Sequence, residues 1–137
     1  MSNMNRHAIR EAAFLLLFER MFQRDLTVQQ TAQMAEECEL FAINDEVLAF
    51  VSGVEEHQTE IDEMISRYLV KWTLSRISKV SLAILRLAVY EILYCDQTQN
   101  DIAISEAVLL ANAYAYPEDV KFVNGLLGSL NRGLKAE

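Results

Sequence analysis

The sequence predicts an all-α protein, and three observations lead to this fold class. Only one proline and four glycines occur among 137 residues, which leaves little of the turn chemistry that β-sandwiches and barrels need. Hydrophobic residues make up 52% of the chain, enough for a substantial core. Apolar residues also recur at helical spacing along most of its length. We therefore expect a single domain, residues 1–137, with about seven helices in two groups, roughly 1–72 and 73–137.

The first helix is expected over residues 6–23, RHAIREAAFLLLFERMFQ. This segment is apolar nearly all round, as in helices that are buried on several sides, so we expect it to be a central element. Thr27 and Gln30 have the spacing of a capping box and predict a second helix that runs to about Glu37.

Two more helices are expected in the first group. Asn44 can cap the third helix and Thr59 the fourth, with the break between them near residues 53–59. Both helices carry apolar residues at i, i+3, i+4 and i+7 spacing. These are Val47, Phe50, Val51 and Val54 in the third, and Ile61, Met64, Ile65, Tyr68 and Leu69 in the fourth.

The second group begins with another central helix. Ser78 can cap it, and its segment LAILRLAVYEILY, residues 82–94, is apolar around most of its circumference. Residues 95–101 form a polar loop, and residues 102–114 resume helical spacing. Pro117 suits the first turn of the last helix.

Three of the four glycines, Gly125, Gly128 and Gly133, lie in this last helical segment. Each glycine inside a helix costs about 0.5–1 kcal/mol relative to alanine, so a packing reason is expected. Gly125 and Gly128 lie one turn apart, and we expect them to expose bare backbone that lets the helix over residues 82–94 approach closely. Gly133 is expected to end the helix.

The formal charge of −8 is unevenly distributed. Residues 31–65 contain ten acids and no Lys or Arg, whereas residues 66–95 contain five bases and one acid. A uniformly acidic protein would repel nucleic acid, but here acidic and basic residues lie in separate stretches, so a local basic face is possible. The acidic stretch is expected to be a solvated helix surface.

Few residues are candidates for catalysis or metal binding: the sequence leaves a Ser/His/Asp arrangement open but contains no nucleophile elbow. His7 and His57 have no metal-ligand spacing with Cys38 or Cys95, and no glycine-rich nucleotide motif occurs. We expect no enzyme activity, no cofactor and no metal. Two distant cysteines without a secretion signal, and no apolar run of about 18 residues, predict a cytoplasmic protein with reduced thiols and no membrane span.

Nucleic-acid binding has more support. Arg6 and Arg10 share one face of the first helix, where they could reach phosphates. Lys121, Phe122 and Asn124 offer a cation, an aromatic ring and an amide, which suits single-stranded RNA. The competing interpretation, which composition alone favours, is that Phe122 is a core residue and the polar residues are solvated.

The sequence resembles the bacterial NusB family. The blocks LAILRLAVYEILY (82–94), IAISEAVLLANAY (102–114) and KFVNGLLGSL (121–130) look like that family's signature, and RHAIREAAFLLLF resembles its first helix. The similarity covers essentially the whole chain and is strongest over residues 76–130. It implies an all-helical fold of two antiparallel sub-bundles packed together.

The resemblance also implies a function in transcription antitermination, in which the protein acts as an adaptor and does not catalyse a reaction. Such proteins bind the boxA element of nascent ribosomal RNA leaders together with NusE, a ribosomal protein. The complex joins RNA polymerase and other Nus factors so that transcription passes terminators. The residues that the resemblance assigns to RNA are Arg6, Arg10, Lys121, Phe122 and Asn124, with Phe18 and Tyr68 as further aromatic contacts.

Departures from the family pattern refine this expectation. The N-terminal basic run is short, Tyr116-Pro117 replaces a glycine-containing turn, and the chain is acidic. We therefore expect RNA binding to depend strongly on NusE. Two alternatives stay open: a helical adaptor or homodimer without intrinsic RNA binding, and the RNA-binding domain of a ribosomal RNA cytosine methylase. The chain length disfavours the methylase.

Overall fold

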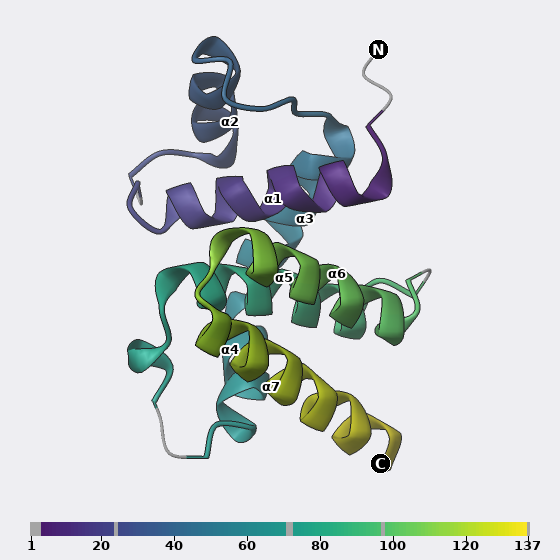
Figure 1. The fold of residues 1–137 in the computed structure, drawn as a ribbon. Coiled ribbons are helices and arrows are strands. Elements are labelled where there is room, and N and C mark those ends of the chain that lie inside the picture. The colour runs from purple at the N-terminus through teal and green to yellow at the C-terminus, as the bar shows by residue number, and fades with distance from the viewer. Residues whose placement is uncertain (1–3, 24, 71–72, 97, 137) are drawn as a thin grey trace. The chain divides into compact units, whose positions relative to one another are not determined.

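The computed structural model describes residues 4–23, 25–70, 73–96 and 98–136. Within these residues every regular element is helical, as predicted (Figure 1). The elements in chain order are α1 (Arg6–Arg20), α2 (Val28–Glu37), α3 (Asp45–Glu56), α4 (Gln58–Arg67), the short 3₁₀ helix η1 (Leu74–Arg76), α5 (Lys79–Tyr94), α6 (Asn100–Tyr114) and α7 (Pro117–Ala136).

Local capping chemistry starts several of these helices where the sequence predicts. Thr27 and Gln30 form a complete capping box at α2. Asn44 Oδ1 accepts a hydrogen bond from the Val47 amide at 2.9 Å, and Ser78 Oγ accepts one from the Ser81 amide at 3.1 Å. The predicted Thr59 cap is wrong, because α4 begins at Gln58 after His57, whose side chain makes no capping bond.

The chain divides into two compact units, Met1–Glu56 and His57–Glu137. This division falls earlier than the boundary expected near residue 72, so α4 lies with the second unit. Its packing explains why: α4 contacts α5 and α7. Arg86 on α5 also donates from Nε and Nη2 to the two carboxylate oxygens of Asp62 on α4, each at 2.9 Å.

In the first unit, α1 packs against α2 and α3. The α3 residues predicted to be apolar core, Val47, Phe50, Val51 and Val54, are all buried. Arg20 links the three helices at one end. Its guanidinium pairs with the Glu55 carboxylate on α3 and donates to the Leu26 carbonyl at 3.0 Å and to Thr31 Oγ1 on α2 at 2.9 Å.

In the second unit, α5 packs against α4, α6 and α7 and is buried along most of its length. The helix α6 lies against both α5 and α7, so these three helices pack around a common core (Figure 1). The buried face of α6 consists of Ala103, Ala107, Leu110 and Ala111. None of the helices in the described part of the chain combines the length and the hydrophobicity that a membrane span requires.

Candidate nucleic-acid interface

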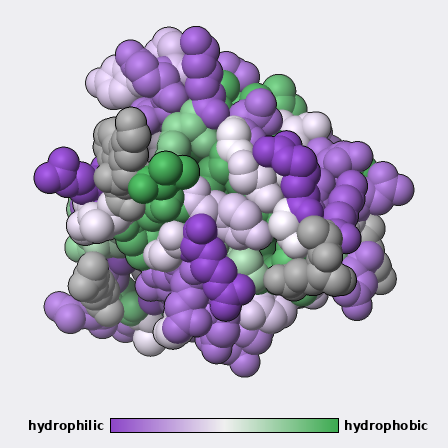
Figure 2. All heavy atoms as spheres, turned by 90° about the horizontal axis from the view of Figure 1, so that it is seen from below, coloured by the Kyte–Doolittle hydropathy of each residue, from purple (hydrophilic) through white to green (hydrophobic). Residues whose placement is uncertain are grey.

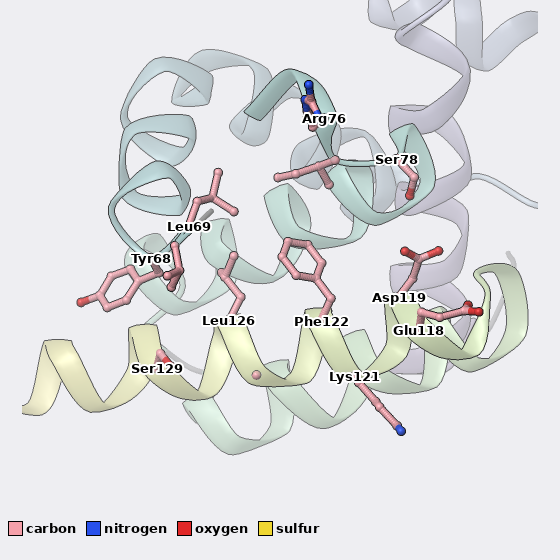
Figure 3. A pocket seen from close by; sticks show the side chains of 13 residues that line it. Tyr68, Leu69, Arg76, Ser78, Glu118, Asp119, Lys121, Phe122, Leu126 and Ser129 are labelled. Carbon is pink, nitrogen blue, oxygen red and sulfur yellow. The ribbon is translucent and has the colours of Figure 1, made fainter. Parts of the chain in front are cut away.

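A cavity of about 690 Å³ opens on the second unit, between α7 and the segment that follows α4 (Figure 3). Much of its lining is apolar, with charged side chains at the rim. The described residues that line it are Tyr68, Leu69, Val70, Arg76, Ile77, Ser78, Glu118, Asp119, Lys121, Phe122, Gly125, Leu126 and Ser129. Val70 is 92% exposed. Seen from below, exposed hydrophobic atoms are bordered by hydrophilic side chains (Figure 2).

Helical periodicity explains how α7 forms one wall. Phe122, Leu126 and Ser129 follow i, i+4 and i+7 spacing and therefore lie on one face. That face lines the cavity, whereas Val123, Leu127 and Leu130 on another face are fully buried in the core. Phe122 is half-buried, and its ring points into the space between α7 and the segment opposite (Figure 3). A half-buried aromatic ring in an open apolar cavity can receive another flat or apolar group.

The first turn of α7 places two acids at the cavity rim. Pro117 begins the helix, and Glu118 and Asp119 follow, as the helix dipole favours. The Asp119 carboxylate accepts a hydrogen bond from the Tyr116 amide at 3.4 Å. The cationic side chains of the lining are Arg76 and Lys121. Among the described residues of the lining, the two cations therefore balance the two acids.

The predicted group of Lys121, Phe122 and Asn124 does not converge on one point. Lys121 extends away from the cavity in Figure 3, and Asn124 is exposed and outside the lining. Successive residues of a helix differ by about 100° in direction, so neighbours in sequence cannot all face one cavity. Phe122 instead shares the cavity lining with Tyr68, which comes from the end of α4 and whose ring extends away from Phe122 (Figure 3).

Tyr68 is positioned by a close approach to α7. It caps the C-terminal end of α4, and its amide donates to the Ile65 carbonyl. A Cβ at Gly133 would lie 1.9 Å from Tyr68 Oη and 2.9 Å from Cζ, so only glycine leaves room for the ring as it stands. Gly133 lies inside α7, which continues to Ala136, so the expectation that it ends the helix is wrong.

The expected close packing at Gly125 and Gly128 is also wrong. A Cβ at Gly125 would meet no described atom within 4 Å, and one at Gly128 would meet Arg132 Nη1 of the same helix at 3.4 Å. Gly125 is exposed and lines the cavity, so it does not face α5.

The remaining predicted residues, Arg6, Arg10 and Phe18, lie on α1 in the first unit. Arg6 is exposed and pairs with the Glu46 carboxylate, and its guanidinium lies 6.0 Å from the centre of the Phe50 ring. Arg10 is only 3% exposed, so its side chain does not present the same surface as Arg6. Phe18 is half-buried between Phe14 and Phe22, at ring-centre distances of 6.4 and 5.3 Å.

Sequence reasoning missed Leu69, Arg76, Ile77 and Leu126 as part of this site. The signal for Leu126 was present, since it lies one turn after Phe122. Residues 69–77 carry no periodicity that indicates which side chains face α7. Among the described residues, no group of three His, Cys, Asp or Glu side chains is arranged to hold a metal ion.

Together, these observations define a protein whose described residues form an all-helical fold with an open, partly aromatic cavity. A family model described as the NusB family matches residues 7–132. The transcription antitermination protein NusB of Acetivibrio thermocellus is 42% identical over 128 residues, which cover 93% of this chain and 88% of that protein. The chain belongs to the NusB family.

Solved structures agree with this assignment. A structure of T. maritima NusB superimposes with a TM-score of 0.82 at 34% identity and covers 96% of this chain and 93% of that one. A crystal structure of the antitermination factors NusB and NusE in complex with dsRNA contains a chain similar to this one, with a TM-score of 0.81 at 25% identity. That match covers 93% of this chain and 96% of the other.

Proposed function

We propose that this protein is a transcription antitermination factor that binds boxA RNA of ribosomal RNA leaders together with NusE. In this role it helps RNA polymerase and other Nus factors to read through terminators. Membership of the NusB family is the observation that carries the proposal. The solved relative with NusE and RNA supports the same partners. The protein acts in the cytoplasm by binding, without turnover of a substrate.

The cavity beside α7 is our proposed contact for an unpaired base. Every base has a flat face, so an aromatic ring in an open apolar cavity can stack on it regardless of sequence. Phe122 supplies that ring, and Tyr68 borders the same space. Arg76 can approach the phosphate next to the stacked base. Lys121 and Asn124, which point elsewhere on α7, would contact the neighbouring nucleotides.

Affinity of the isolated protein for RNA is expected to be low. Phosphate contacts supply a large share of the affinity in such complexes, and the described residues of the lining include two cations and two acids, with Lys121 extending away from the cavity. Arg6 is already paired with Glu46. NusE therefore has to supply or organise further phosphate contacts.

Fluorescence anisotropy of a labelled boxA RNA tests this function. The titration is made with and without NusE at two salt concentrations, with a scrambled RNA and a duplex as controls. We expect NusE-dependent, salt-sensitive binding to the single-stranded boxA sequence. Phe122→Ala should weaken it about 5- to 150-fold, the equivalent of about 1–3 kcal/mol for one stacked base.

Tyr116→Ala is the matched control, because Tyr116 is 76% exposed and lies outside the cavity lining. It should leave RNA affinity unchanged. If wild-type protein bound NusE but no RNA under any of these conditions, the proposal of an RNA-binding factor would fail. The alternative of a helical protein adaptor would then take its place.

A further inference from the structure

The outward face of α6 carries an apolar stripe. Ile102 and Leu109, seven residues apart, lie on the same side of the helix and are 46% and 52% exposed. Ala113 continues the stripe one turn later and is also exposed. Tyr116, 76% exposed, follows just after the helix. This side is opposite the alanine-rich face that packs on α5 and α7, so the core does not explain it.

The segment that carries the stripe has acids as its charged residues. Residues 95–120 contain five acids, Asp96, Asp101, Glu106, Glu118 and Asp119, and no Lys or Arg. Asp101 lies beside Ile102 at one end of α6, and Glu118 follows Tyr116 at the other. Single exposed apolar side chains are common on protein surfaces, but two large ones a heptad apart on one helix, with acids as the charged residues of the same segment, are a more specific feature.

We propose that this face of α6 binds a basic amphipathic helix of another protein. Leucine-like residues of that helix would lie along Ile102, Leu109 and Ala113, and its Lys or Arg side chains would approach the acids at the two ends of α6, Asp101 and Glu118. Small polar residues, Ser105 and Asn112, interrupt the row, so the buried area is modest. Such a surface suits a reversible contact rather than a permanent one.

The acidic residues beside this face disfavour two other binding partners, a second copy of this chain and RNA. A second copy of this chain would bring acidic borders against acidic borders, which repel when directly opposed. RNA would meet the same acids with its phosphates. Only a partner with positive charge beside its apolar residues matches both features of the face.

A pair of synthetic peptides tests the proposal with the full chain. One peptide has the 15-residue length of α6 and carries leucine at helical spacing with lysine elsewhere. The other replaces every lysine with glutamate. We expect the lysine peptide to bind, more weakly at high salt, and the glutamate peptide not to bind. Leu109→Glu should weaken binding of the lysine peptide about tenfold or more.

Leu40→Glu provides the charge-matched control. Leu40 is 59% exposed and lies in the other acid-rich stretch of the chain, so the substitution changes net charge equally. It should leave peptide affinity within about twofold of wild type. Equal losses in Leu109→Glu and Leu40→Glu would mean non-specific attraction and would overturn the proposal.

A second variant and two controls distinguish loss of the binding face from unfolding and from a change of oligomeric state. Ile102→Glu should reproduce the effect of Leu109→Glu, and circular dichroism checks that both variants are folded. Light scattering measures the oligomeric state of each variant. If the lysine peptide did not bind and Leu109→Glu instead converted a dimer into monomers, the occupant would be a second copy and the proposal would be wrong.

Discussion

Gly133 and Tyr68 are predicted to be energetically coupled, and Gly133→Ala is the change that tests this. The new Cβ would lie 1.9 Å from Tyr68 Oη. Because non-bonded heavy atoms approach to about 3.5 Å, the hydroxyl has to move by roughly 1.5 Å. Such overpacking costs about 1–3 kcal/mol. Alanine regains about 0.5–1 kcal/mol of helix propensity, so we expect a net loss of about 1 kcal/mol.

A double-mutant cycle isolates this coupling. In a Tyr68→Ala background the clash is gone, so Gly133→Ala should stabilise the protein by about 0.5–1 kcal/mol. Gly125→Ala on the same helix is the control and should stabilise the protein in both backgrounds, since nothing described lies within 4 Å of its Cβ. Urea unfolding followed by circular dichroism gives the free energies of unfolding. If Gly133→Ala stabilised the protein equally in both backgrounds, the close approach of Tyr68 to α7 would be refuted.

Three other substitutions have defined outcomes in the same unfolding assay. Arg20→Met should lower the free energy of unfolding by about 2–4 kcal/mol, because it leaves Glu55 unpaired. Adding Glu55→Leu should make the loss smaller, since no unpaired carboxylate remains. If the losses of the two single variants were additive in the double variant, an interaction between Arg20 and Glu55 would be excluded. Glu39→Gly should stabilise the protein by about 0.5–1 kcal/mol, because Glu39 has φ of 56° in the turn that ends α2. Asp62→Asn should cost about 1–3 kcal/mol by weakening the bidentate pair with Arg86, and an unchanged midpoint would show that this pair contributes nothing.

The helices were predictable where local chemistry determines them. Thr27, Asn44 and Ser78 are close in sequence to the amides they bind, so their roles as caps follow from spacing alone. The glycines of α7 show the opposite case. Which of them faces a neighbouring side chain depends on where Tyr68 lies, and Tyr68 is far from Gly133 in sequence.

The candidate site also contains residues that the sequence predicts and residues that it does not. Phe122 was identified from its own residue type and neighbours, and it does line a cavity. The facing residues Leu69, Arg76 and Ile77 come from an irregular segment, whose side-chain directions follow from tertiary packing and not from a helical repeat. Arg10 is one helical turn from Arg6, and this spacing predicted that both would reach phosphates, yet Arg10 is buried. Charge and spacing do not reveal such burial.

We propose that boxA RNA is held at the α7 cavity when NusE is present. Photo-crosslinking measures this most directly, with 5-iodouridine placed at single positions of the RNA and the adducts located by mass spectrometry. A stacked base places its iodouracil against an aromatic ring, so we predict a NusE-dependent adduct on Phe122 or Tyr68 that is lost with scrambled RNA. Adducts confined to other parts of the chain, with Phe122 and Tyr68 unmodified at every position of the label, would contradict the account.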